Sequence, residues 1–81
     1  MTMFGVSKAF VKMRKETFKK GSRVKLIRMD DDYAPPSGTK GTVTHVDDLG
    51  TIHVEWDNGS TLGVISEDVC VVINEEGGTL R

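Results

Sequence analysis

The chain has 81 residues, of which 37% are hydrophobic, and a formal net charge of −1. A chain of this length folds as one small domain with a single core, which leaves little room for a deep internal active site. Its one cysteine excludes an intramolecular disulfide and fits a reducing compartment. Because no apolar run reaches the length of a membrane span and no secretory leader is recognisable, the sequence predicts a cytoplasmic protein.

The charges are distributed unevenly along the chain. Residues 1–29 carry nine basic residues and one acid, whereas residues 30–81 carry two basic residues and eleven acids. Such asymmetry is typical of a basic arm that binds nucleic acid or an acidic partner. It is equally typical of an arm that docks on its own acidic body, so the sequence leaves both interpretations open.

The N-terminal segment, residues 1–19, is predicted to be a basic helix or arm. Ser7 can accept a hydrogen bond from a backbone amide that follows it, and so cap a helix. Phe10 and Met13 then recur at helical spacing, which predicts a short amphipathic helix from about Lys8 to Thr17. A helix this short is marginal in water by itself, so we expect it to dock on something.

Residues 20–73 contain short runs in which apolar and polar residues alternate, as they do in half-buried strands. The run "GSRVKLIRM" places Val24 and Leu26 on one face, with basic residues between them. The acidic, proline-containing "DDDYAPPSGTKG" predicts a long loop, because proline donates no hydrogen bond to a β-ladder. Further on, apolar residues alternate with His53 and Glu55, and "DDLG" and "DNGS" have the composition of tight turns.

The remaining residues complete the predicted fold. Ser66 to Asp68 resembles a single 3₁₀ turn, "VCVVI" a buried last strand that holds Cys70, and residues 74–81 a flexible tail. Five strands joined by one long loop, two short turns and one 3₁₀ turn follow the order of an SH3-like small barrel. We therefore predict a mainly β protein, a five-stranded SH3-like barrel over residues 20–73. Its expected core contains Val43, Ile52, Val54 and Trp56, although Trp56 could instead line a binding groove.

Three elements follow one another between Gly41 and Gly59: Gly-Thr-Val, Gly-Thr-Ile-His-Val and Trp-Asp-Asn-Gly. Together with the preceding "GSRVKLIRMDDDYAPPSG" they closely resemble domain of unknown function 4314, a family of small proteins of bacteriophages and conjugative elements of Gram-positive bacteria. The resemblance runs from about Phe18 to Val72, leaves the Lys8 to Lys20 arm outside, and implies no catalytic residue. More distantly, the hairpin looks like that of SH3-like barrels such as the ribosomal KOW domains and the Mib/HERC2 domains, which bind RNA, protein or peptide.

Few residues have the spacing that catalysis or metal binding requires. His45 and His53 lie on neighbouring predicted strands, and with Asp47 or Asp48 they are the best candidates for a metal or acid–base site. No further ligand converges on them, so we read them as the solvent-exposed face of a hairpin. The acidic stretch Asp30 to Tyr33 lacks the spacing of a calcium-binding loop, and no serine, threonine or cysteine has a recognisable base. We therefore expect no enzyme, no metal and no cofactor.

Two classes of function remain. The first is a non-enzymatic binding module of phage or mobile-element type that engages a protein. An inhibitor of a host defence or DNA-processing protein belongs to this class, because a compact acidic surface can mimic nucleic acid. The candidate contacts with a protein partner are Phe10, Met13, Phe18 and Tyr33.

The alternative is a nucleic-acid-binding accessory protein that uses the basic arm and the first strand. Its candidate contacts are Lys12, Arg14, Lys15, Lys19, Lys20, Arg23, Lys25 and Arg28. The acidic body and the small number of aromatic residues argue against broad nucleic-acid contact, so we place the protein-binding class first. In either class we expect a monomer or a weak dimer.

Overall fold

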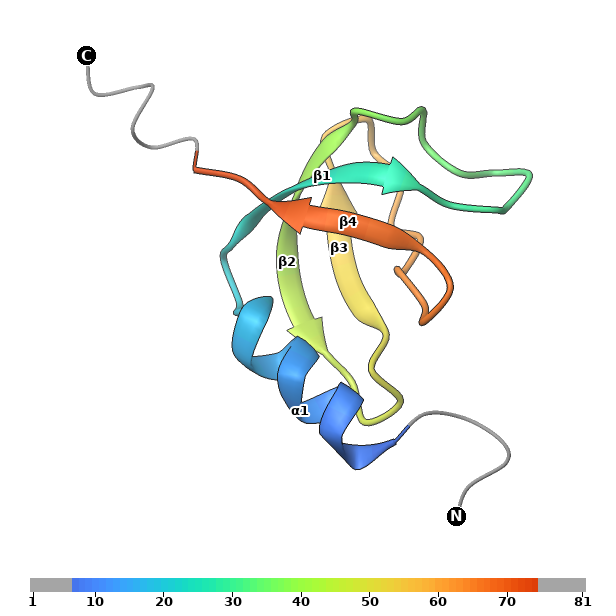
Figure 1. Ribbon diagram of the computed structural model, residues 1–81. Helices are drawn as coiled ribbons and strands as arrows, with labels where there is room; N and C mark the ends of the chain where they lie inside the picture. Colours follow the sequence, from blue (N-terminus) through green and yellow to red (C-terminus); the bar gives the residue numbers. More distant parts are fainter. Residues whose placement is uncertain (1–6, 75–81) are drawn as a thin grey trace.

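The computed structural model describes residues 7–74, in which one helix precedes four strands (Figure 1). The predicted tail lies outside the described residues except for Asn74. In chain order the elements are α1 (Lys8–Thr17), β1 (Arg23–Arg28), β2 (Lys40–Val46), β3 (Ile52–Trp56) and β4 (Val69–Val72). The prediction of a mainly β protein with a short N-terminal helix is confirmed.

The four strands form one antiparallel sheet in the order β3-β2-β1-β4. The β1 strand pairs with both β2 and β4, so the first and last strands of the chain are neighbours. Two irregularities in register, between Val43 and His45 of β2 and between Leu26 and Arg28 of β1, mark bulges that increase the bend of the sheet. The sheet is strongly bent but does not close (Figure 1).

Of the five predicted strands, the fourth in chain order, which holds Val64, is reduced to a single bridge with Ile52. Instead of pairing with a strand, the carbonyl of Leu62 accepts a hydrogen bond of 2.9 Å from the indole Nε1 of Trp56. The sequence shows a suitable apolar pattern here, but the indole gives this carbonyl a hydrogen-bond partner outside a β-ladder. The 3₁₀ turn expected at Ser66 to Asp68 is a single turn closed by the Asp68 amide and the Ile65 carbonyl, 3.1 Å apart.

The core lies on the concave face of the sheet. The four core residues predicted from the sequence, Val43, Ile52, Val54 and Trp56, are all buried, together with Val24, Leu26, Val64 and Cys70. Trp56 therefore belongs to the core. The β4 strand differs from its prediction as a buried strand, because only Cys70 of its residues is buried and the valines around it are exposed.

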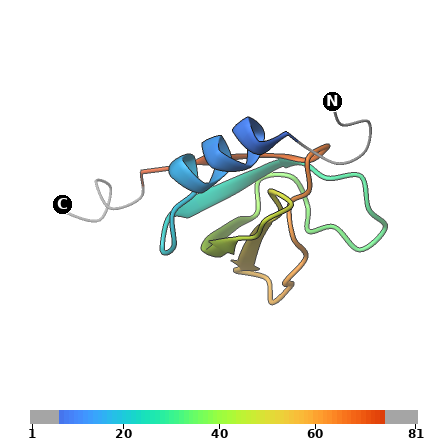
Figure 2. The same cartoon turned by 90° about the horizontal axis from the view of Figure 1, so that it is seen from below.

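The helix begins and ends where the sequence predicts. The Ser7 Oγ accepts a hydrogen bond of 3.1 Å from the Phe10 amide, which caps the N-terminus of α1. At the other end the chain reverses through Gly21, whose φ of 88° lies in the left-handed region that favours glycine. Seen from below, α1 lies along one side of the bent sheet (Figure 2).

Candidate functional site

Arg14 attaches α1 to the sheet. Its side chain projects from α1 into the body, and only 7% of the residue is exposed. The guanidinium Nη1 donates hydrogen bonds to the carbonyls of Gly50 (2.9 Å), Val64 (2.9 Å) and Ile65 (3.1 Å), and Nη2 donates to that of Asp68 (3.3 Å). Burial lowers the pKa of Arg14 below its ordinary value, but a guanidinium remains charged at neutral pH. Arg14 is therefore a structural anchor and is not available to nucleic acid.

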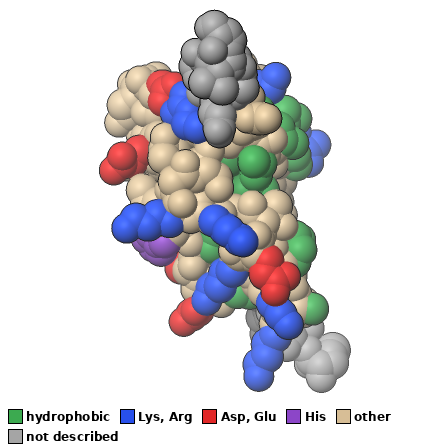
Figure 3. All heavy atoms as spheres, turned by 90° about the vertical axis from the view of Figure 1, so that its left-hand side faces the viewer, with side chains coloured by type: hydrophobic (Ala, Val, Ile, Leu, Met, Phe, Trp, Pro, Cys, Tyr) green, Lys and Arg blue, Asp and Glu red, His purple; other side chains and the backbone are tan. Residues whose placement is uncertain are grey.

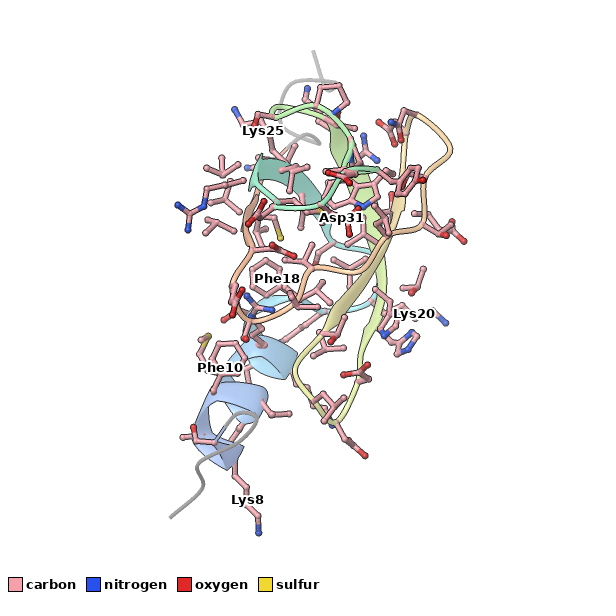
Figure 4. The ribbon with its side chains drawn as sticks, turned by 90° about the vertical axis from the view of Figure 1, so that its right-hand side faces the viewer. Lys8, Phe10, Phe18, Lys20, Lys25 and Asp31 are labelled. Carbon is pink, nitrogen blue, oxygen red and sulfur yellow. The ribbon has the colours of Figure 1, made fainter. Side chains whose placement is uncertain are left out.

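Two of the three predicted docking residues on the helix also contact the body. The Phe10 ring lies 4.7 Å from the Arg14 guanidinium, a cation–π contact. Phe10 also packs against Gly50, where an added Cβ would lie 2.8 Å from the ring. Phe18 packs against the core, and the two rings lie on the body side of α1 in Figure 4. Met13, which is 47% exposed, is the one residue of this helical set that is accessible to a partner.

Three lysines lie on a different side of α1, and a fourth follows its C-terminus. Lys8, Lys12 and Lys15 follow the spacing of one helical face, so their side chains fall within about 60° of arc around the axis, whereas Lys19 comes after the C-cap residue Phe18. All four are exposed, and we call this set the lysine ridge. Figure 3 shows basic side chains gathered over the part of the molecule that α1 occupies.

An open groove of about 590 Å³ adjoins the lysine ridge. Lys8, Lys12 and Lys15 line it together with Val11, Glu16 and Asp48. The Lys15 Nζ lies 2.8 Å from Asp48 Oδ1 at the β2–β3 turn. The other three lysines of the ridge form no ion pair with an acid within residues 7–74. The predicted docking of the arm on its own acidic body therefore consists of one ion pair, while Arg14 supplies the main contact.

The predicted basic strip along β1 is partly neutralised. The Arg23 guanidinium makes two hydrogen bonds to the Asp57 carboxylate, of 2.9 and 2.7 Å, and a third to Thr42 Oγ1. These hydrogen bonds hold the pKa of Asp57 below its ordinary value. Lys20 and Arg28 are exposed and Lys25 is half-buried, so these three remain accessible at the surface.

An apolar patch covers the outer face of β1 and β4. Because Val24, Leu26 and Cys70 point into the core, the alternating residues Ile27, Val69 and Val71 point outward, and each is 40–43% exposed. We call these three residues the outer sheet patch. Hydrophobic side chains beside basic ones are visible in the upper part of Figure 3, at its right-hand edge. The sequence does not reveal this patch, because "VCVVI" has the composition of a strand buried on both faces.

The two histidines lie together as the sequence predicts, but their surroundings are those of a turn. Their rings stack with centroids 4.3 Å apart, and the His53 Nε2 lies 2.9 Å from Asp47 Oδ2. The other oxygen of Asp47 accepts hydrogen bonds from the amides of Leu49 and Thr51 and so shapes the β2–β3 turn. The hydrogen bond from His53 lowers the pKa of Asp47. No group of three or more potential metal ligands converges within the described part of the chain.

The acidic loop between β1 and β2 carries the last predicted contact. Tyr33 is 83% exposed, and its backbone amide donates a hydrogen bond of 2.8 Å to Asp31 Oδ1. Nothing in this loop brings Tyr33 close to the exposed residues of α1. The four predicted contacts with a protein therefore do not form one surface.

A protein-family model described as a domain of unknown function, DUF4314, matches residues 7–73. The chain belongs to this family. Comparisons with curated proteins and with solved structures give no match.

The DUF4314 match corrects one expectation from the sequence. It begins at Ser7 and therefore includes the Lys8 to Lys20 arm, whereas the resemblance seen in the sequence begins only at about Phe18. The hydrogen bonds of Arg14 explain why the helix and the sheet occur in one unit. Within residues 7–74 no helix has the length and apolar character needed to cross a membrane.

Proposed function

We propose that the protein is a small non-enzymatic binding module, of the phage or mobile-element type, that engages a protein partner. The contact surface in this proposal is the outer sheet patch of Ile27, Val69 and Val71. The observation that carries it is that three branched apolar side chains adjoin on neighbouring strands and remain exposed. Adjoining exposed apolar side chains mark interaction surfaces, whereas a lone one such as Leu49 needs no explanation.

The basic residues beside the patch indicate the chemistry of the partner. Lys25 is paired with Val71 across the ladder, and Arg28 with Val69. A complementary protein segment presents apolar side chains bordered by aspartate or glutamate. The apolar contacts supply affinity, while the charge pairs at the rim set orientation and accelerate association.

The strand arrangement supports a binding role as well. The β1 strand lies between β2 and β4, and residues 29–39 connect β1 to β2. The Val64 bridge lies where the fourth of the five strands is predicted. We infer from this order that the fold is an open variant of the SH3-like barrel. The SH3-like barrels that the hairpin resembles bind RNA, protein or peptide, and their binding surfaces need no catalytic group.

Affinity capture with matched variants tests the proposal. The full chain and its Val71→Asp variant are used as baits in a host extract, and Leu49→Asp serves as the control. Leu49 is apolar and 69% exposed but lies on the β2–β3 turn, outside the patch. Both substitutions add the same charge to an exposed position, so general electrostatic effects cancel.

We expect one protein that binds the wild-type chain and Leu49→Asp but not Val71→Asp. The dissociation constant, measured with the purified partner, should rise at least tenfold for Val71→Asp and also rise for Lys25→Glu. Trp56 fluorescence would verify that each variant is folded. A partner that binds all four chains equally would show that the outer sheet patch is not the contact surface.

A further inference from the structure

We propose that the lysine ridge of α1 is a second binding surface, which contacts the phosphate backbone of duplex DNA without reading its sequence. The proposal is independent of the outer sheet patch and uses none of its residues. It also replaces the eight-residue basic set predicted from the sequence with a smaller one: Lys8, Lys12, Lys15 and Lys19.

The first argument is geometric. Seven residues separate Lys8 from Lys15, so the helical part of the ridge extends about 10 Å along the helix axis. Within α1 the lysines recur every three or four residues, which places one ammonium group about every 5–6 Å along a single line. Lys19, exposed just beyond the end of α1, adds a fourth mobile cation, so the set can contact three or four phosphates of a duplex.

The second argument is that the helix cannot rotate freely. The four hydrogen bonds of Arg14 hold one side of α1 against the body. The Phe10 ring lies on the same side and stacks against that guanidinium. Since Lys8 and Lys12 lie on the far side of α1, they face solvent in preformed positions. Binding therefore requires ordering of side chains only, and not of the helix.

The third argument concerns which nucleic acid fits. Single strands are held by stacking of bases on exposed aromatic rings. Trp56 is buried, and Phe10 and Phe18 face the body, so the ridge offers no ring for stacking. Its other neighbours, Val11 and Glu16, lack the guanidinium or amide group that makes bidentate contacts with guanine or adenine. Contacts restricted to phosphates position a protein on a duplex but carry no sequence information.

Asp48 sets the strength of this site. Its carboxylate lies 2.8 Å from the Lys15 Nζ and lines the same groove. It therefore partly neutralises Lys15 and also repels phosphate. Three lysines are then fully available and the fourth is available in part. Each neutralised phosphate contributes about −0.9 to the slope of log affinity against log salt, which predicts a slope between about −2.7 and −3.6.

Fluorescence anisotropy tests the proposal with the full chain and two unrelated labelled 20-base-pair duplexes between 25 and 200 mM NaCl. We expect both duplexes to bind equally, with the slope given above. Such non-specific complexes typically have dissociation constants of about 10⁻⁴–10⁻⁶ M at physiological salt. Asp48→Asn should tighten binding and move the slope toward −3.6, because it frees Lys15 and removes a negative charge.

Two double variants provide a matched control. Lys12→Gln with Lys19→Gln removes two charges from the ridge, and Lys25→Gln with Arg28→Gln removes two from the outer sheet face. The first should reduce the magnitude of the slope by about 1.8 and the second should leave it unchanged. Since all four side chains lie at the surface, both variants should keep the helical circular dichroism of the wild type.

Three outcomes would overturn the proposal: equal loss of affinity in both double variants, a slope smaller in magnitude than about 1, or tighter binding of a 20-nucleotide single strand than of the duplex. Val71→Asp should leave DNA binding unaltered. Failure of the ridge and failure of the protein-binding patch are therefore distinguishable.

Discussion

Replacement of Arg14 by alanine should destabilise the protein by about 3 kcal/mol. Arg14 is the only donor to the carbonyls of Gly50 and Asp68 among the hydrogen bonds of residues 7–74. The Val64 carbonyl also accepts from the Ile52 amide, and the Ile65 carbonyl from the Asp68 amide, so these two keep one partner each. The substitution therefore leaves two buried carbonyls without a partner.

The magnitude follows from the cost of those two groups. An unpaired buried acceptor costs about 1–3 kcal/mol, so two cost about 2–6 kcal/mol. The alanine variant no longer buries a charged guanidinium, and the loss of this desolvation cost offsets part of the destabilisation. The remaining 3 kcal/mol is a large fraction of the roughly 4–12 kcal/mol expected for a chain of this length.

Urea denaturation measures the effect directly. The chain has one tryptophan, and because Trp56 is buried its emission reports the loss of the core. Arg14→Lys should also be destabilised, since one ammonium cannot reach all the carbonyls that the planar guanidinium reaches on two segments, at Gly50 and at residues 64–68. The neighbouring Lys15→Gln is the control and should change the free energy of unfolding by less than about 0.5 kcal/mol. An Arg14→Ala variant as stable as that control would refute the anchoring role.

Four further predictions concern the rest of the chain. Removal of residues 1–18 tests whether residues 20–73 fold alone, as the sequence predicts. Because this deletion removes Arg14 and its hydrogen bonds to the body, we expect a lower urea midpoint. An unaltered midpoint would show that α1 adds no stability. Trp56→Ala should cost about 3–5 kcal/mol, since it deletes a large buried side chain; a variant that keeps its melting temperature would contradict this. Burial raises the pKa of the Cys70 thiol to about 11, so Ellman's reagent at pH 8 should react with the unfolded chain and only slowly with the native one. The hydrogen bond from His53 lowers the pKa of Asp47, so the ionised carboxylate contributes fully to stability above about pH 4, the ordinary aspartate value, and this contribution is lost as the pH falls through the lower pKa of the folded state. Between pH 2 and 6 the urea midpoint should therefore fall less steeply for Asp47→Asn than for the wild type. Identical pH dependences of the two midpoints would contradict this role of Asp47.

The amino-acid sequence by itself determined the local elements. Ser7 and the spacing of Phe10 and Met13 predict α1 at its observed bounds, because capping and helical periodicity act within a few residues. The "DDLG" and "DNGS" turns lie where they are predicted, since aspartate, asparagine and glycine favour turns through their own side chains and backbone freedom. Alternation likewise identifies Val54 and Trp56 as core residues.

Only the tertiary structure decided which charged and apolar side chains are buried, which are exposed and which groups they hydrogen-bond. A lone arginine on a basic helix has every sequence feature of a solvent-exposed side chain, and Arg14 is buried because carbonyls from two distant segments, Gly50 and residues 64–68, converge on it. The indole of Trp56 donates a hydrogen bond to the Leu62 carbonyl, in the stretch where the fourth of the five strands is predicted. The valines beside Cys70 are exposed because no helix or second sheet formed by residues 7–74 covers the outer face of β4. Each outcome depends on which groups meet across long separations in the chain, which local periodicity does not encode.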